Sequence, residues 1–136
     1  MHISAKGEYA VRALLEIAAR SDYVSVDEIV AVQRLPKAFV ASILLDLRRC
    51  ELVRARRGNG GYLLSRPAEQ ISVGEILRAV DGPITLVRGM PPTELHYTGA
   101  SQHLGSVWAQ IADHLGDLLE RVSLAGVLAG SAPAPA

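Results

Sequence analysis

Residues 35–67, LPKAFVASILLDLRRCELVRARRGNGGYLLSRP, decide the fold of this chain. Pro36 suits the first turn of a helix, and apolar residues then recur at helical spacing to about Cys50, at Val40, Ile43, Leu44 and Leu47. The β-prone runs 52–56 and 62–64 are separated by RGNGG, whose glycines and asparagine permit the positive φ values of a tight reversal. The stretch therefore predicts a helix followed by a β-hairpin.

Helical patterns flank this stretch on both sides. Ser4 is the expected cap of a helix that ends near residue 20, and the capping box SVDE at 25–28 opens a second, shorter helix. Another capping box, SVGE at 72–75, begins a helix after the hairpin. Two helices, a proline-initiated helix and a glycine-rich hairpin in this order predict a winged helix-turn-helix, a mainly α fold with a small β-hairpin wing.

Composition bounds the class of protein. The chain has 136 residues, 49% of them apolar, which suffices for one domain with its own core. Cys50 is the one cysteine, so the chain cannot form an intrachain disulfide or a thiolate cage. No apolar run reaches the roughly 18 residues of a membrane span and the N-terminus has no hydrophobic secretory segment, so we expect a soluble cytoplasmic protein. The common nucleophile, phosphate-loop and metalloprotease motifs are absent, so we expect no catalytic residues and no enzyme.

The charge is unevenly distributed although the formal net charge is zero. Residues 34–66 contain eight basic side chains against two acidic ones, a net +6, whereas residues 81–136 contain two basic and five acidic ones, a net −3. A local positive excess of this kind is typical of surfaces that bind a polyanion. Because the segment coincides with the predicted third helix and hairpin, it predicts double-stranded DNA as the partner.

Two features of this segment predict how DNA is contacted. The face of the third helix opposite its apolar stripe carries mostly small or basic side chains, which let the helix approach base edges in the major groove: Lys37, Ala38, Ala41, Ser42 and Arg49. Arg56 and Arg57 lie beside the glycines of the hairpin tip, where a guanidinium reaches a phosphate or a narrow minor groove.

The C-terminal part predicts a loop and a long helix. Residues 84–100 show no sustained period and are rich in Gly and Pro, which is typical of a loop. One apolar stripe then follows, made of Leu104, Val107, Trp108, Ile111, Leu115, Leu118, Leu119 and Val122. A second copy of the helix would bury this stripe most completely, so we expect a homodimer. The predicted organisation is a DNA-binding domain at 1–83, the loop at 84–100, a dimerisation helix and a short C-terminal helix at 101–130, and a disordered tail at 131–136.

Four motifs resemble the Rrf2 family of bacterial transcription regulators: MHISAKGEYAVRALLEIA at 1–18, RRCELVRARRGNGGYLLSRP at 48–67, ISVGEILRAVDGP at 71–83 and SLAGVL at 123–128. The resemblance implies a winged helix-turn-helix dimer, crossed through its long C-terminal helix, that binds a palindromic operator, and we expect a repressor. It also implies that Arg57 contacts the minor groove. The predicted DNA-binding residues are Ser4, Lys6, Tyr9, Arg34, Pro36, Lys37, Ala38, Ala41, Ser42, Arg56, Arg57, Gly58 and Asn59.

The chain departs from the family in its loop. Many members carry three cysteines there that ligate an iron-sulfur cluster, and by the family's spacing these positions are Met90, His96 and Gln102 in this chain. A frequent histidine ligand falls on Gly105. Iron-sulfur clusters require thiolate donors, with histidine an occasional replacement. We therefore expect no iron-sulfur cluster and no other cofactor.

Several alternatives remain for the regulatory signal. A small molecule or a protein effector could contact the loop at 84–103. A metal could bind His96 and His103, with Glu8 as a further weak candidate. Cys50 is a redox candidate because its oxidation would disturb the helix that reads DNA; otherwise it is a half-buried apolar filler between helix and hairpin. The fold could also serve as a protein-interaction module that uses its basic face for a protein partner.

Overall fold

The computed structural model describes residues 1–58 and 60–131. It is mainly helical with one two-stranded antiparallel hairpin, so the predicted fold class is confirmed. Its elements, in chain order, are α1 (Ala5–Ala18), α2 (Val26–Gln33), α3 (Lys37–Arg49), β1 (Val53–Ala55), β2 (Tyr62–Leu64), η1 (Ala68–Gln70), α4 (Val73–Asp81), η2 (Pro92–Glu94), η3 (Gly99–Ser101), α5 (Leu104–Arg121) and α6 (Leu124–Leu128).

Serine side chains cap four of these helices by accepting a hydrogen bond from the backbone N–H three residues on, at Ser4, Ser25, Ser72 and Ser123. These caps satisfy amides that a helix leaves without partners, which is why the helices begin there. Pro36 differs slightly from the prediction, because it occupies the N-cap of α3 and the helix begins at the next residue. The first strand is also shorter than the run 52–56.

The core lies between α1, α3 and α4, beneath the hairpin. The apolar stripe of α1 is buried at Ala10, Ala13, Leu14 and Ile17, and that of α3 is buried at Val40, Ile43, Leu44 and Leu47. The hairpin pairs Val53 with Leu64 and Ala55 with Tyr62. α6 returns to this body, where Leu124 is fully buried and its N–H donates to the carbonyl of Ile71.

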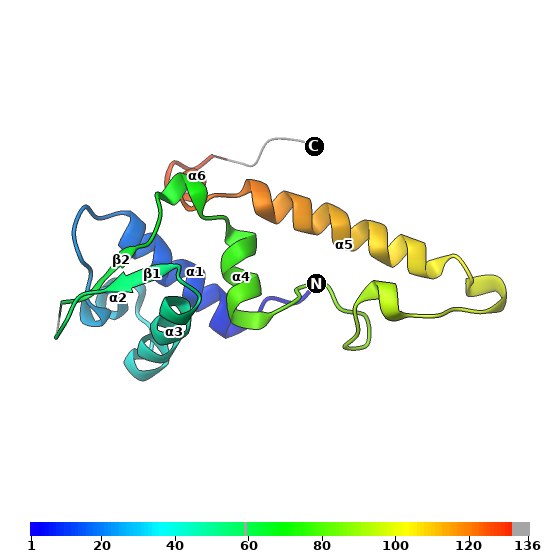
Figure 1. The fold of residues 1–136 in the computed structure, drawn as a ribbon, viewed down its shortest axis with the longest axis horizontal. Helices are drawn as coiled ribbons and strands as arrows, with labels where there is room; N and C mark the ends of the chain where they lie inside the picture. Colours follow the sequence, from blue (N-terminus) through cyan, green and yellow to red (C-terminus); the bar gives the residue numbers. More distant parts are fainter. Residues whose placement is uncertain (59, 132–136) are drawn as a thin grey trace.

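α5 extends away from the body as a single long rod, and the chain that leads into it runs out alongside (Figure 1). None of its 18 residues is buried, although its apolar stripe is present as the sequence predicts. Val107 and Ile111 expose 47% and 45% of their surface. No helix in the described part of the chain is both long enough and apolar enough to cross a membrane.

The segment that precedes α5 is an ordered loop with short turns of 3-10 helix. η2 packs against α5, and Val87 and Met90 form an isolated bridge. The side chain of Trp108 in α5 donates a hydrogen bond to the hydroxyl of Tyr97 at 3.1 Å. At the C-terminus, Ser131 donates its N–H to the carbonyl of Gly126, whereas the rest of the predicted tail lies outside the described residues.

Candidate nucleic-acid interface

The outward face of α3 is formed by residues that follow one another at helical spacing. Ala38, Ser42, Leu45 and Arg49 are all exposed, while the opposite face of the helix lies in the core. Ala41 beside them is partly buried. α2 and α3 form the helix-turn-helix pair, and the predicted DNA contacts on α3 are thus placed on one accessible surface.

The turn between α2 and α3 holds two further predicted contacts. Arg34 is the C-cap of α2, has a left-handed backbone with φ of 56°, and is exposed. Lys37 forms an ion pair with Asp27 of α2 at 2.7 Å, with both side chains largely exposed. Exposed pairs contribute only about 0–1 kcal/mol, so a DNA phosphate can displace this partner.

The N-terminal half of α1 packs beside α3. The ammonium of Lys6 lies 2.9 Å from a carboxylate oxygen of Asp46, and the ring of Tyr9 meets that of Phe39 edge to face at 5.5 Å between centroids. The hydroxyl of Ser4 is engaged within the protein, because it accepts a hydrogen bond from the Gly7 N–H and donates one to the carboxylate of Asp81 in α4. Lys6 and Tyr9 therefore lie at the edge of the α3 surface, while Ser4 links α1 to α4.

Charges at this edge interact. Lys6 donates a hydrogen bond to Asp46 and attracts its negative charge, which lowers the pKa of that carboxyl below its usual value, and Arg49 adds a smaller effect. Asp46 is thereby held as a carboxylate that orients two cations of the surface. It is a structural partner of the cations rather than a group presented to DNA.

Arg12 ties α1 to the end of α2. Its guanidinium donates to the side-chain oxygen of Gln33 at 2.9 Å and to the Gln33 carbonyl at 2.6 Å. It also pairs with Glu8 one turn earlier at 2.9 Å. Glu8, a weak metal candidate from the sequence, is thus engaged by an arginine.

The wing is anchored to the loop between α1 and α2. Val24 and Tyr62 exchange two backbone hydrogen bonds, at 2.9 and 2.8 Å, which extends the hairpin by an isolated bridge. Gly61 has φ of +83°, and a Cβ there would lie 2.6 Å from the Val24 carbonyl oxygen. Only glycine suits this position, for its left-handed backbone and for the close approach.

The two arginines of the wing have different surroundings. The guanidinium of Arg56 lies 4.4 Å from the centre of the Tyr23 ring, a cation–π contact that holds it against the α1–α2 loop. Arg57 is exposed, and Gly58 beside it, with φ of +70°, has open space around it. Arg57 is thus presented on the surface of the wing, whereas Arg56 supports the wing. The prediction for Asn59 lies outside the described residues.

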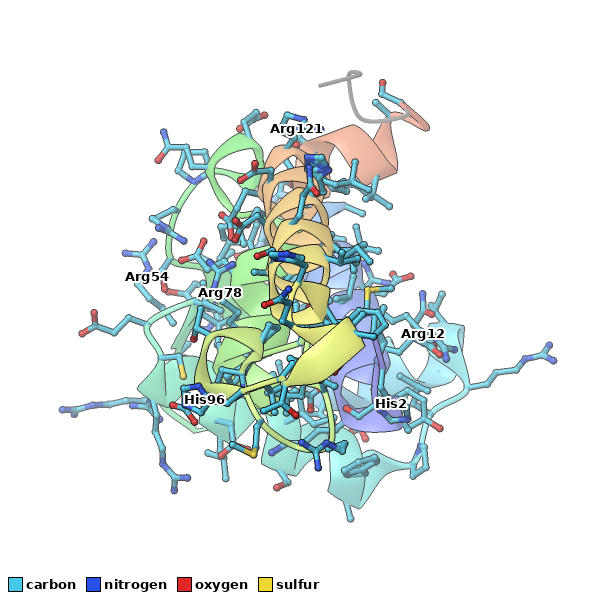
Figure 2. The ribbon with its side chains drawn as sticks, turned by 90° about the vertical axis from the view of Figure 1, so that its right-hand side faces the viewer. His2, Arg12, Arg54, Arg78, His96 and Arg121 are labelled. Carbon is cyan, nitrogen blue, oxygen red and sulfur yellow. The ribbon has the colours of Figure 1, made fainter. Side chains whose placement is uncertain are left out.

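Arginines that the sequence interpretation did not single out extend this positive surface. A cleft of about 290 Å³ between α3 and the wing is lined by Arg48, Arg56 and Arg57. A second one, of about 640 Å³, includes Arg48 and Arg54, and Figure 2 shows Arg54 pointing away from the body. The sequence indicated Arg48 and Arg54 only through their place in the segment 34–66, which has a net charge of +6. Tyr23 had no such signal, because it lies in a polar break between helices.

The residues at the cluster positions do not fit an iron-sulfur cluster. Met90 offers a thioether, Gln102 an amide and His96 an imidazole, whereas such clusters are held by deprotonated thiols. Within residues 1–58 and 60–131, no three His, Cys, Asp or Glu side chains gather as they would around a metal ion. His96 and His103 are both exposed, and neither belongs to such a group.

Cys50 does not lie half-buried between helix and hairpin, which was the alternative to its prediction as a redox residue. It is exposed at the end of α3, and its Sγ lies 3.9 Å from the carbonyl oxygen of Ala79 in α4. The interpretation as a half-buried residue between helix and hairpin is therefore wrong, because the thiol faces α4. Its assignment as a redox residue stays a prediction.

Comparisons with known proteins agree with this architecture. The model of the Rrf2 family, described as an iron-dependent transcriptional regulator, matches residues 3–130. An HTH-type transcriptional regulator of Mycobacterium tuberculosis is 40% identical over 136 residues, which cover 98% of this chain and 84% of the relative.

Two solved structures share the fold. CymR, the global cysteine regulator of B. subtilis, superimposes with a TM-score of 0.82 at 25% identity, covering 96% of this chain and 98% of its own. IscR of T. potens gives a TM-score of 0.76 at 28% identity, covering 96% and 88%. Since the family model spans nearly all of the sequence, this chain belongs to the Rrf2 family of winged helix-turn-helix transcription regulators, DNA-binding proteins without enzymatic activity.

Proposed function

We propose that this chain is a homodimeric repressor that binds a palindromic operator through two copies of α3 and two wings. The observation that carries the proposal is that α3 and the arginine-bearing hairpin border one cleft, lined by Arg48, Arg56 and Arg57. An exposed helix of this kind enters the major groove, while an adjacent arginine reaches the neighbouring minor groove or a phosphate. Two such units bind half-sites separated by about one helical turn.

The unburied stripe of α5 supports a dimer. Eighteen helical residues rise about 27 Å, and Val107, Ile111 and Leu118 of the stripe are exposed in the single chain. A contiguous apolar face on a projecting helix is typical of an interface. In the proposed dimer α5 of one subunit packs along α5 of the other, which sets the distance between the two α3 helices.

The loop that runs alongside α5 supports a position for the regulatory signal. A groove of about 390 Å³ lies between η2 and the start of α5, lined by residues that include Leu95, His96, Tyr97 and Gly105. A small molecule or protein bound there would change the contact between the loop and α5. In a dimer held by α5, such a change would alter the spacing of the DNA-reading helices and therefore the operator affinity.

The proposal is tested by capturing genomic DNA fragments on the purified chain, footprinting the best fragment and measuring the mass of the complex. We expect a palindromic protected site, two chains per site and an affinity that falls steeply with salt. Ile111→Asp places a charge in the stripe and should give monomers with weak operator binding, whereas Gln110→Asp, on the exposed side of α5, should leave the dimer intact. A single chain bound per site, or equal behaviour of both variants, would contradict the proposed dimer.

A further inference from the structure

The base-reading face of α3 is largely apolar. Counting from the start of the helix, Ala38, Ala41, Ser42 and Leu45 are its second, fifth, sixth and ninth residues and share the outward side. Leu45 exposes 46% of its surface although it belongs to a core helix. The positions best placed to meet bases in the proposed complex therefore present three aliphatic side chains and one hydroxyl.

Arginine, asparagine and glutamine, which form bidentate hydrogen bonds with bases, are missing from the first three turns of this face, because Arg48 and Arg49 come only in the last turn of α3. α3, KAFVASILLDLRR, contains no Asn, Gln or Glu. Asp46 is engaged by Lys6 at 2.9 Å and by Arg49 at 3.2 Å, and Lys37 is turned toward Asp27 of α2 at 2.7 Å. In the proposed complex Lys37 exchanges Asp27 for a phosphate, so we assign it to the DNA backbone. In the first two turns Ser42 then bonds the base edge, and a serine hydroxyl is compatible with several different bases.

In the major groove, the apolar group that a base pair presents is the C5 methyl of thymine, and each A·T pair has one. An apolar protein surface therefore distinguishes thymine from the other bases by contact with this methyl. We propose that α3 recognises 5-methyl groups of pyrimidines through Ala38, Ala41 and Leu45, so that the operator half-site is specified mainly by thymine methyls. This inference rests on the proposed function, and it names the chemistry by which that function selects its DNA.

The size of Leu45 supports this assignment. A leucine of this exposure leaves apolar surface in water in the free protein, and contact with a methyl group removes surface of both partners from water. Ala38 and Ala41 let the helix backbone approach closely enough for this contact. The free energy gained for one methyl corresponds to about 0.8 kcal/mol, or about a fourfold change in affinity.

The experiment replaces each thymine of the captured operator by deoxyuridine, which removes the methyl and leaves base pairing and the hydrogen-bonding edges unchanged. Symmetric replacement of a contacted thymine in both half-sites should weaken binding about 16-fold, because two methyls are lost. The same replacements are then measured with the Leu45→Ser variant. At the thymine that Leu45 contacts, removing the methyl should no longer weaken the binding of this variant, because two groups in contact have non-additive effects on affinity. Leu86→Ser, an exposed leucine in the loop, serves as the matched control and should keep the full loss.

The outcomes separate the two proposals. If no uracil substitution changes affinity by more than about 1.5-fold while Arg57→Ala still weakens binding, methyl recognition is wrong and the proposed function stands. If the chain captures no specific DNA at all, both proposals fail. Since the DNA is changed rather than the protein, misfolding of a variant cannot produce the uracil effect.

Discussion

Arg57 of the wing gives the sharpest test of how this chain holds DNA. The residue is exposed beside Gly58, which has open space around it, so Arg57→Ala removes a charge without disturbing the core. A dimer carries two such arginines. If each neutralises one phosphate, the slope of log K against log salt decreases by about 0.9 for each, or about 1.8 in all. If the variant and the wild type bind equally at 1 M salt, this difference in slope makes the variant bind roughly 60-fold more weakly at about 0.1 M salt.

The assay is fluorescence anisotropy of a labelled operator, titrated with the wild type and with Arg57→Ala between about 50 and 200 mM salt. Arg121→Ala is the matched control, because it removes the same charge at the end of the molecule away from α3 (Figure 2). Arg57→Lys should restore most of the salt slope, since it restores the charge, but less of the affinity, because an ammonium lacks the planar fork of arginine.

Equal slopes for Arg57→Ala and Arg121→Ala would refute the reasoning, because any loss of affinity would then not come from released counterions. If Arg56→Ala reduces the salt slope and Arg57→Ala leaves it unchanged, the phosphate contact is made by Arg56, the arginine that packs on Tyr23 in the structure. That result would mean that the wing rearranges when it meets DNA.

Three further predictions concern the support of this surface. Tyr23→Leu should weaken operator binding severalfold while Tyr23→Phe retains it, because only an aromatic ring holds Arg56, as anisotropy titrations would reveal. Gly7→Val should lower the free energy of unfolding by about 1–3 kcal/mol in denaturant melts, since even a Cβ there would lie 2.6 Å from a carboxylate oxygen of α4; an unchanged midpoint would contradict that packing. Since the pKa of Asp46 is lowered in the folded state, its pairing with Lys6 should stabilise the fold above the ordinary carboxyl value of 3.8 and cease to do so as pH falls through the lower folded value. The melting temperatures of the wild type and Lys6→Met should therefore differ at neutral pH and converge in acid, and a constant difference would argue against the ion pair.

The elements of this fold follow from local sequence. The four serine caps, the helical spacing of the buried residues and the glycine-rich reversal all act over a few residues, so their positions can be predicted from neighbours along the chain. The apolar stripe of α5 was predicted on the same basis. The ends of elements shifted by one or two residues, as with Pro36, because a cap and a first turn have similar preferences.

The roles of individual side chains at the DNA surface depended on partners far away in the sequence. Ser4 reaches Asp81 across 77 positions, and Arg56 rests on Tyr23 rather than beside its neighbour Arg57. No periodicity links such residues, so the sequence did not predict that Arg56 packs on Tyr23 or that Ser4, expected among the DNA-binding residues, bonds to Asp81.

The sequence by itself determined the winged helix-turn-helix and the location of positive charge, because these are set by spacing, turn chemistry and composition, and four of its motifs resembled those of the family. Only the tertiary structure decided which cations are already paired within the described residues, and that α5 extends from the body with none of its apolar stripe fully buried. The physical reason is that charge pairing and burial are properties of surfaces. Those surfaces are assembled from segments whose distance along the chain says nothing of their distance in space.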